Sequence, residues 1–363
     1  MPKSAKSLLI GSLEPYSGKS AAILGIAHQL KQKGLDLAYG KPLGGGWGQT
    51  QMADNDDDLQ FVAQTLNLSS DRLQPPLIDL ETASVEQRLR QSEQPNYRQL
   101  LIERSQQQGG DLVILEGPGS LREGKLFDLS VSQIAEAIQA SVLLVVRYHS
   151  LLLLDDVLAA KEFFLGDRLL GIVINDVPVD QRESVEQMIC PFLEQHQIPV
   201  FGILPSSSLL RSVSVGELVR RLKAEVLCRP DRMDLLVESL TIGAMNVNSA
   251  LKYFRARQNM AVVTGGDRTD LQLAALETST QCLILTGHIP PTKEIINRAA
   301  DLEVPILSVD LDTLTTVEII ERAFSEVRLH EPIKFQYVCQ MIEANFDSDR
   351  LLASLGLSPA SVS

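Results

Sequence analysis

The sequence predicts an α/β fold in which a mostly parallel sheet is followed by a second, smaller α/β domain. Two observations support this prediction. Over the first 205 residues, short apolar runs alternate with longer amphipathic stretches, as in chains that build parallel sheets through helical crossovers. After Ser206-Ser207-Ser208, the alternation restarts on a smaller scale. We therefore expect two domains, with their boundary near this serine run.

The first domain is predicted from its buried strands and the helices between them. Short, continuous apolar runs are typical of strands that are covered on both faces of a sheet. We expect such strands at residues 8–10, 35–39, 112–115, 142–146, 169–174 and 200–204, and helices at 20–33, 97–107 and 185–195. Parallel sheets bind ligands at the carboxyl ends of their strands, so the polar residues there are candidate site residues.

The second domain is predicted as a smaller set of strands and helices. Strands are expected at 260–263, 282–285 and 304–309, and helices at 214–222, 270–277, 292–300 and 317–325. Ser214 and Glu217 have the spacing of a capping box, which Thr315 and Glu318 repeat. The stretch 335–357 is expected to pack on this domain as one or two amphipathic helices. The prediction thus divides the chain into residues 1–208, residues 209–357 and a flexible tail at 358–363.

The composition indicates a folded, acidic protein. Of 363 residues, 44% are hydrophobic and 22% are charged, and the formal net charge is −13. Nucleic acids and anionic membranes are bound through basic faces, so we expect neither as a partner. No apolar run approaches the length of a membrane span, and no secretory signal follows the N-terminal lysines. The four cysteines are far apart, so we expect free thiols, no zinc site and a cytoplasmic protein.

The segment GSLEPYSGKS lies between the first predicted strand and a predicted helix. A strand, a tight loop ending in Gly-Lys-Ser and a helix form the usual cradle for the phosphates of a nucleoside triphosphate. Backbone N–H groups from Ser17 and Gly18 onward point at the phosphates, Lys19 adds a positive charge, and the Ser20 hydroxyl can bind Mg²⁺. The standard spacing would put a glycine at Leu13. The position of this loop directly after a strand still favours a site for ATP with Mg²⁺.

Two further strand ends carry groups that suit this chemistry. Lys41 follows the second strand and precedes a glycine-rich loop, where it can bind an anionic ligand; the alternative is an ordinary exposed lysine. Glu116 ends the third strand before a glycine turn, where a carboxylate can hold Mg²⁺ beside a phosphate loop. Asp54 belongs to an acidic group that opens a helix and could supply another metal ligand, although the helix dipole alone also favours acids there.

Polar groups also follow a later strand of each domain. Asn175 offers an amide donor and acceptor that fit the edge of adenine; a turn that caps the strand is the alternative. In the second domain a strand leads into Gly265, Gly266, Asp267, Arg268, Thr269 and Asp270. The glycines permit close approach of a ligand, and successive N–H groups can bind an anion. The alternative is structural: a cap at the helix start, with the arginine paired to a neighbouring acid.

These motifs together resemble a known pair of domains. Residues 7–205 resemble the dethiobiotin synthetase-like P-loop domain found at the N-terminus of long bacterial phosphotransacetylases. Residues 212–328 resemble the DRTGG domain that follows it there, through the motifs TGGDRTD, CLILTG and DTLTTVE. The chain is therefore similar to stand-alone members of the phosphotransacetylase family. We expect no acetyl transfer, because a chain ending at residue 363 leaves no room for the catalytic domain that performs it.

The resemblance to dethiobiotin synthetases also implies roles for individual residues. The implied residues are Lys19 and Ser20 for ATP–Mg²⁺, Lys41 for the substrate side, Asp54 and Glu116 for the metal, and Asn175 and Asp176 for adenine. The loop departs from the synthetase pattern, because it has one more residue between Gly11 and Gly18.

Two functions fit these features. The first is a regulatory protein in which the P-loop domain binds ATP–Mg²⁺ and the DRTGG domain binds a small-molecule effector or mediates oligomerisation, with a homodimer favoured. The second is an ATP-dependent ligase or carboxylase acting on a small carboxylate or amine, in which Lys41 orients the acceptor and Lys19 stabilises the transferred phosphoryl group. A scaffold with a vestigial loop is a third interpretation, against which the intact Lys19 and Ser20 argue. We favour the regulatory protein, because the second domain has no role in ligase chemistry.

Overall fold

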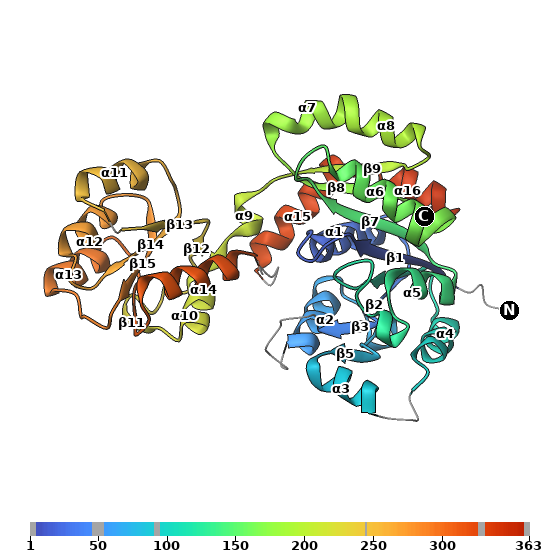
Figure 1. Ribbon diagram of the computed structural model, residues 1–363, viewed down its shortest axis with the longest axis horizontal. Helices are drawn as coiled ribbons and strands as arrows, with labels where there is room; N and C mark the ends of the chain where they lie inside the picture. Colours follow the sequence, from blue (N-terminus) through green and yellow to red (C-terminus); the bar gives the residue numbers. More distant parts are fainter. Residues whose placement is uncertain (1–4, 46–53, 91–94, 244, 326–330, 359–363) are drawn as a thin grey trace. The chain divides into compact units, whose positions relative to one another are not determined.

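The computed structural model describes residues 5–45, 54–90, 95–243, 245–325 and 331–358 (Figure 1). The chain forms two units, the first from residues 1–206 and 330–363 and the second from residues 207–329. Both units are α/β, and the first carries the mostly parallel sheet that the sequence predicts. Within the described ranges, no helix is long and apolar enough to cross a membrane.

The first unit is built on a seven-stranded sheet of order β4-β2-β6-β1-β7-β8-β9, in which all neighbours are parallel. Its strands are β1 (Lys6–Ser12), β2 (Leu37–Gly40), β4 (Leu73–Gln74), β6 (Leu112–Glu116), β7 (Ser141–Arg147), β8 (Leu169–Val177) and β9 (Val200–Pro205). The strands expected from the apolar runs are present. The short edge strand β4 was not expected, because two residues carry no periodic signal. A separate parallel pair joins β3 (Leu43–Gly45) to β5 (Ile78–Leu80).

Helices follow the strands of this sheet. They are α1 (Lys19–Gln32), α2 (Asp54–Thr65), α3 (Thr82–Arg90), α4 (Tyr97–Gln107), α5 (Val131–Ile138), α6 (Leu153–Ala160), α7 (Arg182–Ser184) and α8 (Cys190–Gln195). In the central strand β1, Leu8, Leu9 and Ile10 are all 0% exposed, so the sheet is covered on both faces. This burial explains why the strand reads as a continuous apolar run.

The C-terminal helices α15 (Pro332–Asn345) and α16 (Ser348–Leu355) belong to the first unit, which corrects their expected place on the second. Helix α15 packs closely on α1, since a Cβ built on Gly25 would lie 2.4 Å from Ile342 Cγ1. Arg350 of α16 donates to Glu194 at 2.7 Å. An amphipathic pattern predicts that one face of a helix is buried but does not identify what covers it, which is why the expectation failed.

The second unit is built on a five-stranded sheet of order β11-β16-β15-β14-β13. Its strands are β11 (Glu225–Cys228), β13 (Ser239–Ile242), β14 (Met260–Gly265), β15 (Thr280–Thr286) and β16 (Ile306–Val309); β10 (Val213–Ser214) and β12 (Leu236–Val237) form a separate pair. Only the edge strand β11 of the larger sheet is antiparallel to its neighbour. The helices are α9 (Ser208–Arg211), α10 (Val215–Leu222), α11 (Val247–Arg255), α12 (Thr269–Leu276), α13 (Lys293–Asp301) and α14 (Thr313–Ser325).

The two expected capping boxes in this unit differ in outcome. Ser214 caps α10 as expected, because its hydroxyl accepts from the Glu217 N–H at 3.3 Å. The second expected start, at Thr315, was wrong: α14 begins at Thr313, and the Thr315 N–H donates to the Asp312 carboxylate at 3.0 Å. Aspartate is as good a cap as threonine, so the earlier acid starts the helix.

Candidate functional site

The loop between β1 and α1 contains a strained glycine that is held from a neighbouring strand. Gly18 has φ +86°, and a Cβ on it would lie 2.1 Å from Asn175 Nδ2. The Asn175 amide donates to the Ser17 carbonyl oxygen at 2.8 Å. Only glycine fits this position without displacing Asn175. The end of β8 therefore fixes the backbone that leads into α1.

Lys19 and Ser20 begin α1 and contact the end of β6. Lys19 Nζ donates to the carbonyl oxygens of Gly117 at 2.5 Å and Pro118 at 2.7 Å. The Ser20 hydroxyl donates to Glu116 Oε1 at 3.1 Å. Because β1 and β6 are parallel neighbours, their carboxyl ends bring the loop and the Glu116 carboxylate together, as the sequence predicts for a phosphate loop beside an acid.

Glu116 is buried at 7% exposure and is surrounded by groups that hold its carboxylate. Tyr39 donates its hydroxyl to Glu116 Oε2 at 2.8 Å, and Lys41 Nζ lies 4.0 Å from Oε1. The structure thus brings Lys41 to the site. Sequence reasoning missed Tyr39, whose signal was a hydroxyl in an otherwise apolar strand two residues before Lys41. A tyrosine that is buried usually has a partner for its hydroxyl.

The charge of Lys19 is affected by its surroundings. Burial lowers the pKa of its ammonium group, and the Glu116 carboxylate opposes this effect. Lys41 lowers the pKa further, whereas Glu123 raises it. Glu123 also accepts a hydrogen bond from the Gly119 N–H, so it lies on the same turn as the carbonyl partners of Lys19. A phosphate group bound here would be attracted by both lysines.

The residues at this site fit an anion with Mg²⁺. Ser17 is 2% exposed, and no described residue forms a hydrogen bond with its hydroxyl oxygen. A ligand oxygen would satisfy this group, which is costly to bury alone. Magnesium takes few protein ligands and prefers oxygen, which matches the pair Ser20 and Glu116. The third expected ligand, Asp54, begins α2, but its side chain lies outside the described residues.

The lengthened part of the loop lies at the surface. Pro15 and Tyr16 are exposed, and the Glu14 carboxylate contacts His149 Nε2 at 2.5 Å. The residues that follow, from Ser17 to Ser20, make the contacts described above. The exposed residues Pro15 and Tyr16 are thus flanked on both sides by residues that contact the rest of the first unit.

The two residues expected to face adenine behave differently. The Asn175 side chain contacts the phosphate loop, whereas Asp176 pairs with Arg147 Nε at 2.9 Å. Both lie within β8, near its carboxyl end. A role for either residue in binding adenine stays a prediction.

The glycine turn of the second unit is bonded mainly to itself. Arg268 donates to the Asp270 carboxylate at 3.2 Å, as the structural alternative proposed. The cap that this alternative also expected was wrong, because α12 begins at Thr269 and the residue before it, Arg268, makes no side-chain cap hydrogen bond. Arg268 Nη2 also donates to the Met245 carbonyl oxygen at 3.1 Å. Gln272, which is 0% exposed, donates to the carbonyl oxygens of Gly265 and Gly266, both at 3.0 Å.

Close packing explains the second glycine of this turn. A Cβ on Gly266 would lie 2.1 Å from the Ile289 backbone oxygen. Asp267 is exposed, and Thr269 is the first residue of α12. A ligand role for these residues stays a prediction, and their observed bonds are those of a framework.

The fold and this site define the first unit as a P-loop nucleotide-binding domain of the α/β class. Residues 6–214, more than half of the chain, match the family model described as AAA domain, and residues 217–323 match the DRTGG domain. The chain belongs to this AAA domain family, with a DRTGG domain after its P-loop domain.

Curated relatives match along almost the whole chain. The phosphate acetyltransferase of Nitratidesulfovibrio vulgaris is 22% identical over 96% of this chain and 51% of its own length. That of Synechocystis sp. is 23% identical over 95% of this chain and 51% of its own length. The chain thus spans about half the length of the curated relatives it matches.

Solved structures show weaker likeness. Signal recognition particle receptor FtsY from Elizabethkingia anophelis, in complex with GDP, covers 56% of this chain and 58% of its own, with a TM-score of 0.35 and 17% identity. The CBS and DRTGG domains of Clostridium perfringens pyrophosphatase, complexed with diadenosine tetraphosphate, cover 37% of this chain and 67% of their own, with a TM-score of 0.28 and 20% identity. Both TM-scores are low, and neither likeness bears on the function of this chain.

Proposed function

We propose that this protein binds ATP with Mg²⁺ in its first unit and acts as a regulatory protein whose second unit binds a small-molecule effector. The observation that carries the proposal is the convergence of Lys19, Ser20 and Glu116 at the carboxyl ends of β1 and β6. The Ser17 hydroxyl, which has no partner among the described residues, supports it.

Each residue has a defined part in this proposal. Lys19 exchanges its two carbonyl partners for phosphate oxygens, because an ammonium group binds an anion more strongly than a neutral carbonyl. Ser20 and Glu116 would hold Mg²⁺, with Asp54 as a further ligand. The metal, when bound, neutralises phosphate charge. Lys41 lies beside Glu116 and adds positive charge to the same region.

The regulatory part of the proposal is supported by the path of the chain. After α14 of the second unit, the chain enters the first unit as α15, which packs on α1 through Gly25 and Ile342. Helix α1 is also the helix that begins at Lys19. Nucleotide binding and the second unit can therefore act on one packed pair of helices, as coupling between two sites requires. Acetyl transfer is not part of this proposal, because this chain matches only about half of the relatives with that name.

An ATP-dependent ligase or carboxylase is the second candidate function. The observation that favours it is the place of Lys41, whose ammonium nitrogen lies 4.0 Å from Glu116 Oε1 at the same site. In that role Lys41 would orient a carboxylate or carbamate toward the transferred phosphoryl group.

Isothermal titration calorimetry of ATP–Mg²⁺ with the wild type and Lys19→Ala tests the nucleotide site. We expect the variant to bind at least tenfold more weakly, since it loses a charge-assisted contact. Lys33→Ala, at the other end of α1, is the matched control and should bind as the wild type does. Equal binding by wild type and Lys19→Ala, or no binding by wild type, would contradict the proposal.

Release of ADP and phosphate separates the two functions. We expect tight binding with little turnover when small carboxylates and amines are added one at a time. Turnover that depends on one of these compounds, and that Lys41→Ala abolishes, would favour the ligase instead.

A further inference from the structure

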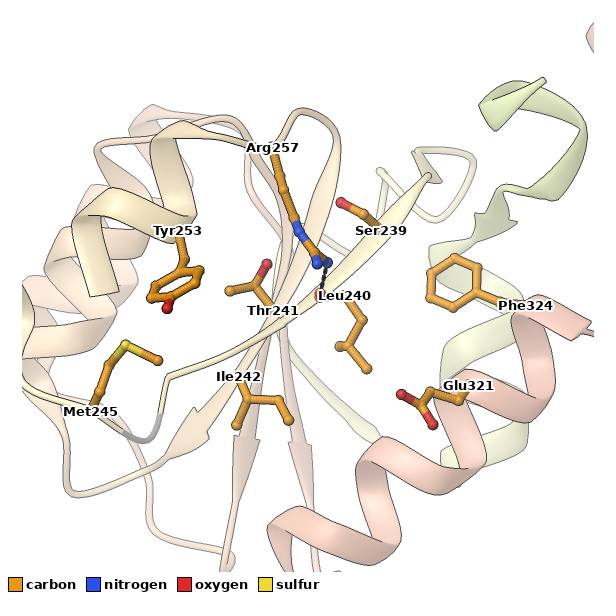
Figure 2. A pocket seen from close by; sticks show the side chains of 9 residues that line it. All are labelled: Ser239, Leu240, Thr241, Ile242, Met245, Tyr253, Arg257, Glu321 and Phe324. Atoms are coloured by element: carbon orange, nitrogen blue, oxygen red, sulfur yellow. Dashed lines mark hydrogen bonds between the residues drawn. The ribbon is translucent and has the colours of Figure 1, made fainter. Parts of the chain in front are cut away.

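A groove runs along the edge strand β13 of the second unit. It has a volume of about 480 Å³ and is lined by residues of β13, α11 and α14 and by Met245 and Arg257 (Figure 2). This volume is within the range of sites for small organic ligands. All of its lining residues belong to the second unit.

Two polar groups of the groove, Thr241 and Arg257, are candidates for binding a ligand. Thr241 is 7% exposed, and its hydroxyl oxygen has no hydrogen-bond partner in the described part of the chain. Figure 2 shows this hydroxyl on the side of the strand that faces the Arg257 guanidinium. A buried hydroxyl without a partner is costly, and a ligand acceptor would remove that cost. Together, an arginine and a hydroxyl suit a negatively charged group.

The rest of the groove is suited to an apolar body. Tyr253 is 57% exposed and Ile242 38% exposed, although both are large and apolar. Met245 lies on the same side as Tyr253, and Phe324 lies on the other side of β13 (Figure 2). An aromatic or aliphatic ligand would remove this surface from water.

The alternative occupant, an added β-strand, is disfavoured by Arg257. Its guanidinium donates to the Leu240 carbonyl oxygen (Figure 2), which is an acceptor that an added strand would need. Arginine has five N–H donors, so the same side chain can still bind an anion. The edge is therefore protected against pairing while the groove stays open to a small molecule.

Glu321 restricts the charge of that molecule. It comes from α14 and lies toward the Ile242 end of the groove in Figure 2, away from Arg257. A second negative group at this end would be repelled. We propose that the β13 groove binds a small organic anion that has an apolar body and a single negative group held by Arg257 and Thr241. This inference rests on the effector part of the proposed function and gives the effector a site and a chemical class.

The inference also gives the glycine turn a role. Arg268 donates to the Met245 carbonyl oxygen at 3.1 Å, and Thr264 donates to the Gly243 carbonyl oxygen at 2.9 Å. Both acceptors lie in the segment that follows β13, and Met245 lines the groove. Arg268 of the turn thus holds the backbone of a residue that lines the groove.

Fluorescence titration with anilinonaphthalene sulfonate tests this proposal, because the probe combines an aromatic body with one negative group. We expect one saturable site in the full chain. Arg257→Gln should weaken binding about tenfold through loss of a charged contact, and Tyr253→Ala should weaken it several-fold. Arg255→Gln is the matched control, because Arg255 is an exposed arginine of α11 that does not line the groove. Thermal melts of each variant confirm that the second unit is folded.

The outcomes separate this inference from the nucleotide site. Probe binding that is equal in the wild type and Lys19→Ala, and weaker in Arg257→Gln, supports the groove even if ATP fails to bind. Unchanged probe binding in Arg257→Gln and Tyr253→Ala overturns the groove proposal and leaves the nucleotide site untouched. A change of sedimentation coefficient in Arg257→Gln without any loss of probe binding also overturns it, in favour of a second copy of the chain.

Discussion

The two units place a glycine turn in the same local setting, between a parallel strand and a helix, but they use the polar groups differently. In the first unit, Lys19, Ser20 and Glu116 converge at a strand end, and the Ser17 hydroxyl lacks a described partner. In the second unit, Arg268 binds Asp270 and a nearby carbonyl. The first turn brings charged and polar groups together where a ligand could bind, whereas the polar groups of the second turn form hydrogen bonds that hold neighbouring segments of the same unit in place.

A strand–glycine–helix pattern therefore predicts the backbone conformation of a turn, but it does not predict whether the turn binds a ligand. Both turns have a glycine at a position where a Cβ would lie too close to an atom of a neighbouring residue. At Gly18 the neighbour is an asparagine side chain, which can move, and at Gly266 it is the Ile289 backbone, which cannot. Substitution at the two glycines should therefore damage different properties: ligand binding at Gly18 and stability at Gly266.

The largest effect is expected for Gly266→Ala. The new methyl group would lie 2.1 Å from the Ile289 oxygen, so β14 and the segment at 289 must separate. We expect the second unit to lose about 3 kcal/mol of unfolding free energy, as over-packed sites do. Hydrogen exchange of the β14 amides, followed by mass spectrometry, measures this loss while ATP–Mg²⁺ binding reports on the first unit.

Gly216→Ala is the control for this prediction. Its Cβ would lie 3.4 Å from the nearest atom, in the first turn of α10, so stability should stay the same or rise slightly. If both alanine variants exchange as the wild type does, the framework role of the second turn is refuted.

A smaller effect, measured on nucleotide binding, is expected for Gly18→Ala, because the loop must shift to relieve the strain of the new side chain. The variant combines a φ of +86° with a contact of 2.1 Å to Asn175 Nδ2. Such strain costs about 1–3 kcal/mol, so we expect ATP–Mg²⁺ affinity to fall about thirtyfold in calorimetry. The double variant Gly18→Ala with Asn175→Ala should recover part of this loss, because it removes the clash but keeps the backbone strain. Equal affinities for wild type and Gly18→Ala would show that the loop is not held as described.

Much of the fold was predictable because its strands are buried on both faces. Continuous apolar runs such as β1 and β7 need no long-range information to be recognised. Strand β13 was missed, since Ser-Leu-Thr-Ile is short and only partly apolar. The packing of α15 on α1 was also missed, because it depends on Gly25 meeting Ile342 across more than 300 residues of sequence.

The candidate site was predictable to a similar extent. Lys19, Lys41 and Glu116 were expected at neighbouring strand ends, because parallel topology alone brings those ends together. The hydrogen bond of Tyr39 to Glu116 and that of Asn175 to the loop depend on side-chain geometry that no spacing rule contains. The groove along β13 was invisible for the same reason, since its walls come from three separate elements.

The smallest effect is expected for Tyr39→Phe, at the first turn. If Ser20 and Glu116 are positioned to bind Mg²⁺, then the Tyr39 hydroxyl, which donates to Glu116 Oε2 at 2.8 Å, should affect the affinity for Mg²⁺. Phenylalanine keeps the ring and loses this hydrogen bond, which is worth about 1 kcal/mol. We expect the Mg²⁺ concentration for half-maximal ATP binding to rise about fivefold, while ATP binding without Mg²⁺ stays unchanged.

Tyr148→Phe is the matched control for that measurement, because its hydroxyl donates to Gln181 at 3.3 Å and does not contact Glu116. A Tyr39→Phe variant with the Mg²⁺ dependence of the wild type would mean that Glu116 is held only as part of the fold. The first turn would then resemble the second, with its polar groups bonded to their own surroundings. A selective change in Mg²⁺ dependence would instead show that the carboxylate is positioned for a ligand, since a purely structural bond would affect ATP binding with and without metal equally.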